Sequence, residues 1–137
     1  MDVNVRGLLL ASRAAARRMP DGGAIVLLAS VNAFQTEARF ADYNASKGAA
    51  VLLTRTLAID WAARGIRVNA VCPGYVRTPM TEAYLADPAT LAGILSHVPL
   101  GRVSSPDEIA ATIAFLASPE AAYISGSSVI IDGGRSA

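Results

Sequence analysis

The sequence predicts an α/β domain in which a parallel sheet of about three strands is covered by helices on both faces. Residues 24–29 form a continuous apolar run of strand length, as expected for a strand buried on both sides. Residues 66–72 are rich in β-branched side chains, which also favour a strand. Segments of helical period precede, separate and follow these runs, and strands that alternate with helices form a parallel sheet through right-handed crossovers.

The first half of the chain has the pattern helix, strand, long helix. Residues 3–19 place apolar side chains and arginines at helical spacing, and a turn rich in proline and glycine ends this helix before the strand at 24–29. Residues 30–40 carry polar side chains without periodicity, which indicates a loop. A helix from about residue 42 to 64 follows and should stop at Gly65, because glycine suits the left-handed backbone just past a helix end.

Three helix starts follow the strand at 66–72. Thr78 and Asp87 each precede a proline, and a good N-cap residue before proline predicts a short helix. Ser105 and Glu108 form a capping box, which predicts a longer helix up to residue 116 or 117.

The last element is a strand at residues 128–131, and no repeat or linker interrupts the order of elements. Residues 1–137 are therefore expected to form a single domain, or one half of one.

Composition excludes several classes of partner. The net charge of +1 gives no electrostatic reason to bind nucleic acid or an acidic membrane surface, and no apolar run approaches the roughly 20 residues that span a bilayer. The single cysteine, Cys72, cannot form an internal disulfide, so a reducing, cytoplasmic location is expected. Cys72 lies in an apolar run and is interpreted as a packing residue rather than a nucleophile.

Tyr43 and Lys47 lie four residues apart on the predicted long helix, so their side chains share one face of it. Eleven of the 12 Lys and Arg residues are arginines, which makes Lys47 the only lysine. A lysine offers a compact charge with three rotatable donors, unlike the planar fork of arginine. One interpretation is a proton-donating tyrosine whose acidity Lys47 tunes; the other is an ordinary exposed pair on a surface helix.

The strand ends supply further candidates, because ligands of an open parallel sheet bind beyond the carboxyl ends of its strands. Ser30 follows the first strand, and Pro73 and Gly74 end the second. Only 13 residues separate Ser30 from Tyr43, so a loop can bring the strand end against the helix start. A serine hydroxyl there can hold a substrate oxygen while Tyr43 exchanges a proton with it.

Five stretches resemble the short-chain dehydrogenase/reductase family, in its form with a serine and a Tyr-x3-Lys site, in order and in spacing. They are residues 4–7, 25–30, 43–47, 67–80 and 126–134, and together they span almost the full chain. The resemblance implies a Rossmann-like doubly wound parallel sheet of which only the C-terminal half is present. The N-terminal dinucleotide-binding half, with its Gly-rich turn and the residue that selects NAD or NADP, has no counterpart in these 137 residues.

The resemblance also implies an NAD(P)-dependent oxidoreductase that interconverts an alcohol and a ketone or aldehyde by hydride transfer. Tyr43 would be the general acid/base, Lys47 would hydrogen-bond the nicotinamide ribose and make Tyr43 more acidic, and Ser30 would orient the substrate oxygen. Asn4 would hold a water in a proton relay behind Lys47; a helix-capping role is its alternative.

The cofactor would be NAD or NADP, with the preference left open by this portion of the family's pattern. The residues implied to contact it are Tyr43, Lys47, Pro73, Gly74, Val76 and Thr78. The partners implied are a small alcohol or carbonyl substrate and, through the two long helices and the last strand, further copies of the chain in a dimer or tetramer. The alternative function is a non-catalytic remnant of such an enzyme that acts as an association module.

Other polar residues are assigned no catalytic role. His97 has no evident acidic partner, so no metal site is predicted. Asp132, before two glycines, suits a turn better than a catalytic acid, and Arg77 suits a solvated loop better than a phosphate or subunit contact. The substrate pocket is expected to have an apolar component from Phe34, Met80, Tyr84 and Leu85.

Overall fold

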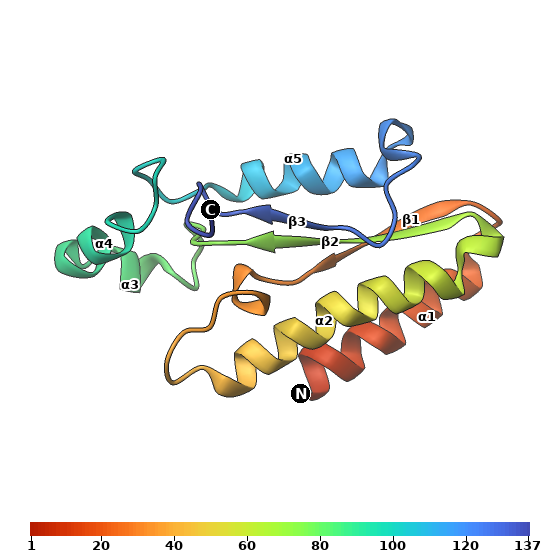
Figure 1. Ribbon diagram of the computed structural model, residues 1–137, viewed down its shortest axis with the longest axis horizontal. Helices are drawn as coiled ribbons and strands as arrows, with labels where there is room; N and C mark the ends of the chain where they lie inside the picture. Colours follow the sequence, from red (N-terminus) through yellow and green to blue (C-terminus); the bar gives the residue numbers. More distant parts are fainter.

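The computed structural model describes residues 1–137 and contains one sheet of three parallel strands (Figure 1). The strands are β1 (Gly23–Leu28), β2 (Ile66–Pro73) and β3 (Ser128–Ile131), in the order β1-β2-β3. The α/β class and the three predicted strands are confirmed, with strand bounds within one residue of those expected from the sequence.

Helices cover both faces of the sheet. Helices α1 (Leu8–Arg18) and α2 (Ala41–Asp60) lie on one face, and α5 (Pro106–Ala117) lies on the other (Figure 1). Because successive side chains of a strand point to opposite faces, β2 contributes Val68 to the α1/α2 side and Val71 to the α5 side.

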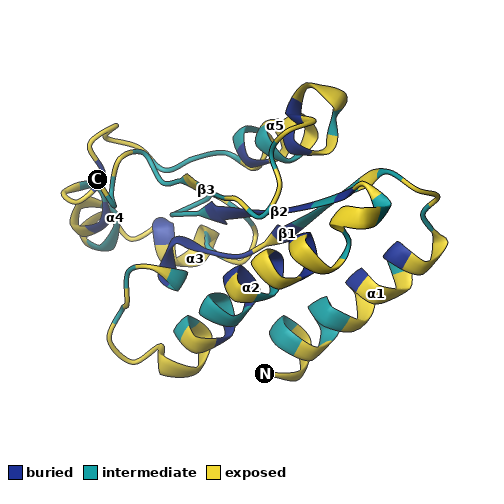
Figure 2. Ribbon diagram, turned by 45° about the vertical axis from the view of Figure 1, so that its right-hand side comes forward, coloured by how far each residue is buried: buried dark blue, intermediate teal, exposed yellow.

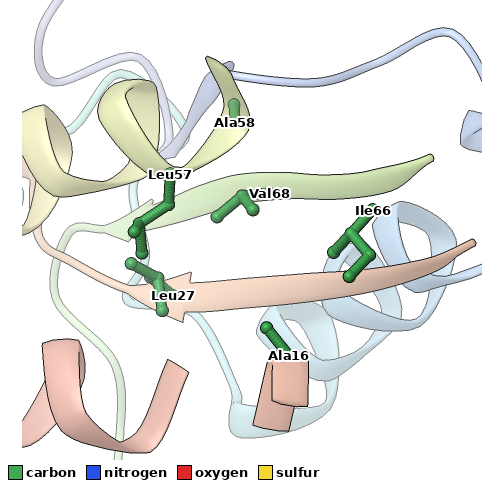
Figure 3. Packing of buried hydrophobic residues seen from close by; sticks show 6 residues of the cluster. All are labelled: Ala16, Leu27, Leu57, Ala58, Ile66 and Val68. Carbon is green, nitrogen blue, oxygen red and sulfur yellow. The ribbon is translucent and has the colours of Figure 1, made fainter. Parts of the chain in front are cut away.

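The core therefore has two layers, one on each side of the sheet. The first joins α1, α2, β1 and β2 through Ala16, Leu27, Leu57, Ala58, Ile66 and Val68 (Figure 3). The second packs Val71 of β2 against Ile109 and Leu116 of α5. The outward faces of α1 and α2 are largely exposed to solvent (Figure 2). The central strand β2, in contrast, has six of its eight residues buried.

The two long helices end differently from their predicted bounds. Residues Asp2–Gly7 form a π-helical turn that leads into α1, where one helix from residue 3 to 19 was expected. Helix α2 stops at Asp60 and a 3₁₀ turn, Ala62–Arg64, replaces its expected last turn. Gly65 then takes the predicted left-handed conformation, with φ of 64°.

Two of the three predicted helix starts are confirmed. Ser105 and Glu108 form both hydrogen bonds of the capping box at the start of α5. The Asp87 carboxylate accepts a hydrogen bond of 2.7 Å from the Thr90 amide at the start of α4 (Pro88–Leu95).

The predicted start at Thr78 is wrong. Helix α3 (Glu82–Leu85) begins only after Thr81. The Thr81 hydroxyl accepts a hydrogen bond from the Thr78 amide at 2.9 Å and donates one to the Val76 carbonyl at 2.6 Å. These bonds hold residues 76–81 in a turn, because a hydroxyl that pairs with nearby backbone competes with helix formation.

The carboxyl ends of all three parallel strands lie at one edge of the sheet, the edge nearest α3 and α4 in Figure 1. The outer edge of β1 carries no neighbouring strand within the 137 residues. None of the helices is long and apolar enough to cross a membrane.

Candidate active site

A cleft of about 240 Å³ lies beyond the carboxyl ends of β1 and β2. Ser30, Tyr43 and Gly74, three of the residues predicted from the sequence, line it together. The remaining lining residues are the polar Asn32, Glu37, Tyr75, Thr81 and Arg135 and the apolar Val31 and Phe40. The structure thus brings the predicted serine and tyrosine to one cavity, although 13 residues separate them in sequence.

Ser30 is held at the end of β1 with its side chain almost fully buried, at 7% exposure. Its backbone is extended, and its hydroxyl oxygen accepts a hydrogen bond of 3.2 Å from the Asn32 amide. The hydroxyl proton has no acceptor within the chain, so it is free to be donated into the cleft.

Tyr43 and Lys47 lie on the first two turns of α2, as predicted, with their side chains close together. The Lys47 ammonium lies 5.6 Å from the centre of the Tyr43 ring and donates a hydrogen bond of 3.1 Å to the carbonyl of Leu28, the last residue of β1. Burial lowers the pKa of Lys47, and the nearby Cys72 opposes this shift. The Tyr43 hydroxyl makes no hydrogen bond within the chain and is 37% exposed as a residue, which leaves it available to a ligand.

Asn4 is tied to the helix that carries this pair. Its side-chain amide donates a hydrogen bond of 3.1 Å to the Ser46 hydroxyl, which in turn donates one of 2.7 Å to the Tyr43 carbonyl. Asn4 lies inside the π-helical turn, and no side chain caps that turn, so the capping alternative is wrong. The contact joins the N-terminal turn to α2 one residue before Lys47.

The turn after β2 places Gly74 in the cleft lining, whereas Pro73, Val76 and Thr78 of the same segment do not line it. The Gly74 amide donates a hydrogen bond of 2.9 Å to the Ile131 carbonyl of β3. The Val76 amide makes no hydrogen bond. On either side of it, the Ser104 amide donates to the Tyr75 carbonyl and the Arg77 amide donates to the Ser104 carbonyl. A free backbone donor therefore remains next to the cleft.

Replacing Gly74 with alanine is expected to destabilise the fold by about 1–3 kcal/mol, the range for overpacking a tight site. A Cβ at this position would lie 2.9 Å from the Asp132 Cβ and 3.0 Å from its Cα, and the second of these is backbone that cannot move aside. The matched control is Gly93→Ala in α4, where a Cβ meets nothing within 4 Å and should be neutral or stabilising. Urea unfolding followed by circular dichroism measures both; an equal effect of the two variants would contradict the expectation.

Three cleft residues that the sequence did not single out form a cluster of their own: Glu37, Tyr75 and Arg135. They follow β1, β2 and β3 respectively, so each lies just beyond the carboxyl end of a strand. The rule that led to Ser30 could have found Arg135 as well, had it been applied to the third strand.

The four residues expected to supply the apolar component of the cleft do not line it. Leu85 is buried in a separate cluster with Ile94 and Val98, and Met80 points into solvent at 92% exposure. Phe34 does not line the cleft, and Tyr84 lines a neighbouring one. Short helices α3 and α4 pack apolar side chains against each other, and the apolar part of the cleft wall comes from Val31 and Phe40.

Two of the residues assigned no catalytic role, Asp132 and Arg77, pair with nearby groups of the chain. The Asp132 carboxylate accepts hydrogen bonds from the Gly134 and Ser136 amides, which makes it a turn residue. Arg77 forms an exposed ion pair of 2.9 Å with Glu82.

Cys72 is expected to resist alkylation in the folded protein. It is fully buried, and burial raises the pKa of its thiol from 9.0 to about 11. Only the thiolate is a nucleophile, so at pH 8 the shift alone lowers the reactive fraction roughly a hundredfold. Iodoacetamide labelling followed by mass spectrometry, with the urea-unfolded protein as control, checks this. Equal labelling rates for the folded and unfolded protein would contradict it.

Parallel strands covered by helices, with serine, tyrosine and lysine gathered beyond their carboxyl ends, define a Rossmann-like protein with a ligand site at that edge. Residues 1–136 match the family profile described as enoyl-(acyl carrier protein) reductase. The chain belongs to the short-chain dehydrogenase/reductase family and corresponds to its C-terminal portion.

Curated relatives align with nearly the whole chain. Galactitol 2-dehydrogenase (L-tagatose-forming) from Cereibacter sphaeroides is 48% identical, over 98% of this chain and 54% of its own length. 3beta-Hydroxysteroid dehydrogenase 1 from Eggerthella lenta is 42% identical, over 98% of this chain and 52% of its own. The chain therefore spans about half the length of the curated relatives it matches.

Solved structures agree in fold. A putative 2-deoxy-D-gluconate 3-dehydrogenase from Agrobacterium tumefaciens with bound NADP superimposes with a TM-score of 0.94 at 40% identity, covering 98% of this chain and 56% of that one. A mutant 4-hydroxyisoleucine dehydrogenase complexed with NADH and succinate gives 0.94 at 36% identity, covering 98% and 57%. A Serratia marcescens short-chain dehydrogenase/reductase mutant gives 0.92 at 43% identity, covering 98% and 54%. Two of these related structures thus contain a nicotinamide cofactor, NADP in one and NADH in the other.

Proposed function

We propose that the chain is the catalytic half of an NAD(P)-dependent oxidoreductase that interconverts an alcohol and a ketone or aldehyde. One observation carries the proposal: Ser30 and Tyr43, whose hydroxyl protons have no acceptor in the chain, line one cleft, and the Lys47 ammonium lies 5.6 Å from the Tyr43 ring. A hydroxyl donor to hold the substrate oxygen and a phenol to exchange its proton are the groups that this reaction needs from the protein.

The proton transfer can be assigned to this chain's own residues. In reduction, the Ser30 hydroxyl donates a hydrogen bond to the carbonyl oxygen, and Tyr43 gives that oxygen its proton. In oxidation, Tyr43 takes the proton back from the alcohol. The positive charge of Lys47 stabilises the phenolate that forms in reduction, and the bond from Asn4 to Ser46 holds the first turns of α2 in place.

The residues beside the cleft fit a nicotinamide nucleoside. Lys47 uses one of its three N–H donors on Leu28, which leaves two for the hydroxyls of a ribose. The free Val76 amide can donate to a carboxamide oxygen, and Pro73, Gly74 and Thr78 shape the same turn. Bound NAD or NADP supplies the hydride acceptor in oxidation, and its reduced form supplies the hydride in reduction.

We further propose that the chain works with a segment that holds the rest of the cofactor. The Gly-rich turn that binds a pyrophosphate at a helix N-terminus does not occur in residues 1–137. Such a segment would also pair with the open edge of β1, an edge that otherwise invites association.

The 137-residue chain alone is accordingly expected to bind NADH and NADPH with dissociation constants well above micromolar. Isothermal titration calorimetry checks this. Micromolar affinity of the isolated chain would show that residues 1–137 are sufficient to hold the cofactor, and would contradict the need for a second segment.

Activity is tested in what we call the completed enzyme, in which the unmatched N-terminal half of a relative precedes residues 1–137. The N-terminal half is taken either from the galactitol 2-dehydrogenase or from the 3beta-hydroxysteroid dehydrogenase. The test needs only one of these two versions to fold. Turnover of secondary alcohols with NAD⁺ or NADP⁺, read at 340 nm, is the expected result. A folded completed enzyme that binds the cofactor but oxidises none of a panel of polyols, simple alcohols and steroids would overturn the proposal.

The second candidate function is a non-catalytic association module. Exposed apolar side chains on α2 favour self-association both for the enzyme and for such a module. Leu52 and Ile59 are both mostly exposed on its outer face, and we propose that a dimer or tetramer covers them. Light scattering after Leu52→Glu tests this; an unchanged oligomeric state would exclude this face. Cofactor-dependent turnover separates the enzyme from a module that only associates.

A further inference from the structure

The cluster of Glu37, Tyr75 and Arg135 forms part of the wall of the cleft that Ser30 and Tyr43 also line. The Tyr75 hydroxyl donates a hydrogen bond of 2.9 Å to Oε1 of Glu37, and Arg135 donates one of 2.8 Å to the same oxygen. The Arg135 guanidinium also stacks on the Tyr75 ring at 5.0 Å. Side-chain exposure is 17% for Arg135 and 28% for Glu37, so the ion pair is largely withdrawn from bulk water.

From this cluster we propose a substrate class: a neutral molecule with several hydroxyl groups, a polyol or sugar, whose hydroxyls next to the reacting carbon bind Glu37 and Arg135. The inference rests on the proposed function, since it takes the reacting carbon to lie between Ser30 and Tyr43.

Unused hydrogen-bonding groups in the cluster match a pair of hydroxyls. Both bonds to Glu37 fall on Oε1, and Oε2 has no partner in the chain. Arg135 uses Nη2 alone, which leaves the donors on Nε and Nη1. A carboxylate oxygen that accepts and a guanidinium that donates, side by side, complement a hydroxyl, which does both.

The charge of the cluster disfavours an anionic substrate. Glu37 neutralises Arg135, so the pair offers a carboxylate or phosphate no net attraction, and Glu37 would repel it. Tyr75 adds no charge, because burial and the bond to Glu37 raise its pKa to about 12 and keep it protonated. Tyr75 is thus a fixed donor that positions Glu37, while Tyr43 remains the free hydroxyl of the cleft.

A substrate without further hydroxyls would also bind poorly. It would cover Oε2 of Glu37 and the free donors of Arg135 without pairing them, and a site built to hydrogen-bond discriminates strongly against ligands that lack the partner group.

The stack of Arg135 on Tyr75 is part of the lining of the cleft. Both residues also line a second cleft of about 420 Å³ against α4, together with Tyr84, Ile94 and His97. The stacked pair therefore borders both clefts.

The test uses the completed enzyme with the steroid dehydrogenase donor, so that a preference for polyols has to come from this chain. Initial rates are compared for galactitol and sorbitol, for cyclohexanol as a substrate with one hydroxyl, and for gluconate as an anionic one. We expect kcat/KM for the better polyol to exceed that for cyclohexanol and gluconate at least tenfold. Equal or higher values for cyclohexanol or gluconate would overturn the inference and leave the proposed function standing, whereas no turnover of any alcohol by a folded completed enzyme that binds the cofactor would overturn the function itself.

Variants assign the preference to the cluster. Glu37→Gln and Tyr75→Phe should lower kcat/KM for the polyol about tenfold or more, mainly through KM, and leave that for cyclohexanol within about twofold. Glu37→Gln should also raise turnover of gluconate, because Arg135 loses its counter-charge. The matched control is Glu82→Gln, which makes the same change in the exposed ion pair with Arg77 and should alter neither ratio.

Comparing two substrates within one preparation keeps the test valid if a variant is partly unfolded, since unfolding lowers both rates equally. Parallel losses for polyol and cyclohexanol in both Glu37→Gln and Tyr75→Phe would assign the cluster a purely structural role and overturn the inference.

Discussion

Tyr43→Phe in the completed enzyme is expected to lower kcat by about 10²–10⁴-fold, the usual contribution of a general acid/base. Phenylalanine keeps the ring that packs edge-on against Phe40, with centroids 6.4 Å apart, and removes only the hydroxyl. That hydroxyl has no partner in the chain, so its loss should cost little stability. The affinity for NADH should stay within about threefold, because Lys47 and the turn after β2 remain.

Tyr123→Phe is the matched control, since Tyr123 is fully exposed and lies away from the cleft. Stopped-flow measurement of kcat and fluorescence titration of NADH separate chemistry from binding in both variants. A Tyr43→Phe enzyme that keeps more than half of the wild-type kcat would remove Tyr43 from the reaction and with it the proposed mechanism.

Lys47→Met should have an effect of similar size but of a different kind. It removes the charge 5.6 Å from the Tyr43 ring and the donor that reaches Leu28, so both turnover and cofactor affinity should fall, each by about tenfold or more for a charged donor. Lys47→Arg should restore little, because a planar fork does not fit a half-buried site that suits a compact ammonium. Arg55→Met, on the exposed side of the same helix, controls for the loss of one positive charge.

The pH dependence of turnover tests whether the charge of Lys47 supports the Tyr43 phenolate. Because burial lowers its pKa, Lys47 loses its proton at a lower pH than a free lysine, and the support of its charge for a Tyr43 phenolate disappears above that pH. Turnover in the oxidation direction should therefore fall on the alkaline side before a free lysine would titrate. Lys47→Arg should lack this alkaline fall, since arginine keeps its charge. An identical alkaline limb in both enzymes would exclude Lys47 as its source.

Together the two variants distinguish catalysis from binding. Loss of kcat with intact NADH affinity in Tyr43→Phe, and loss of both in Lys47→Met, is the pattern that the geometry predicts. Loss of NADH affinity with intact kcat in Tyr43→Phe would leave the proton transfer without a donor and contradict the proposed roles.

Local features of the chain could be predicted because their causes are local. Ser105 and Glu108 cap α5 through bonds that span three residues, and Gly65 takes the left-handed conformation that ends a helix. The predicted helix start at Thr78 was wrong for an equally short-range reason. The hydroxyl of Thr81, three residues further on, hydrogen-bonds the backbone of the turn, and the helix begins only after it. A pattern of Thr before Pro carries no information about that competing bond.

The sequence by itself determined the α/β class and the three strands through periodicity, and short spacings indicated the candidate trio of Ser30, Tyr43 and Lys47. The family followed from the resemblance of five stretches to known members. Only the tertiary structure decided what surrounds that trio. Arg135 meets Glu37 across 98 residues of chain, and Leu85, expected in the cleft, packs against α4 instead. Such contacts depend on how strand ends and short helices converge in space, and no local pattern records that convergence.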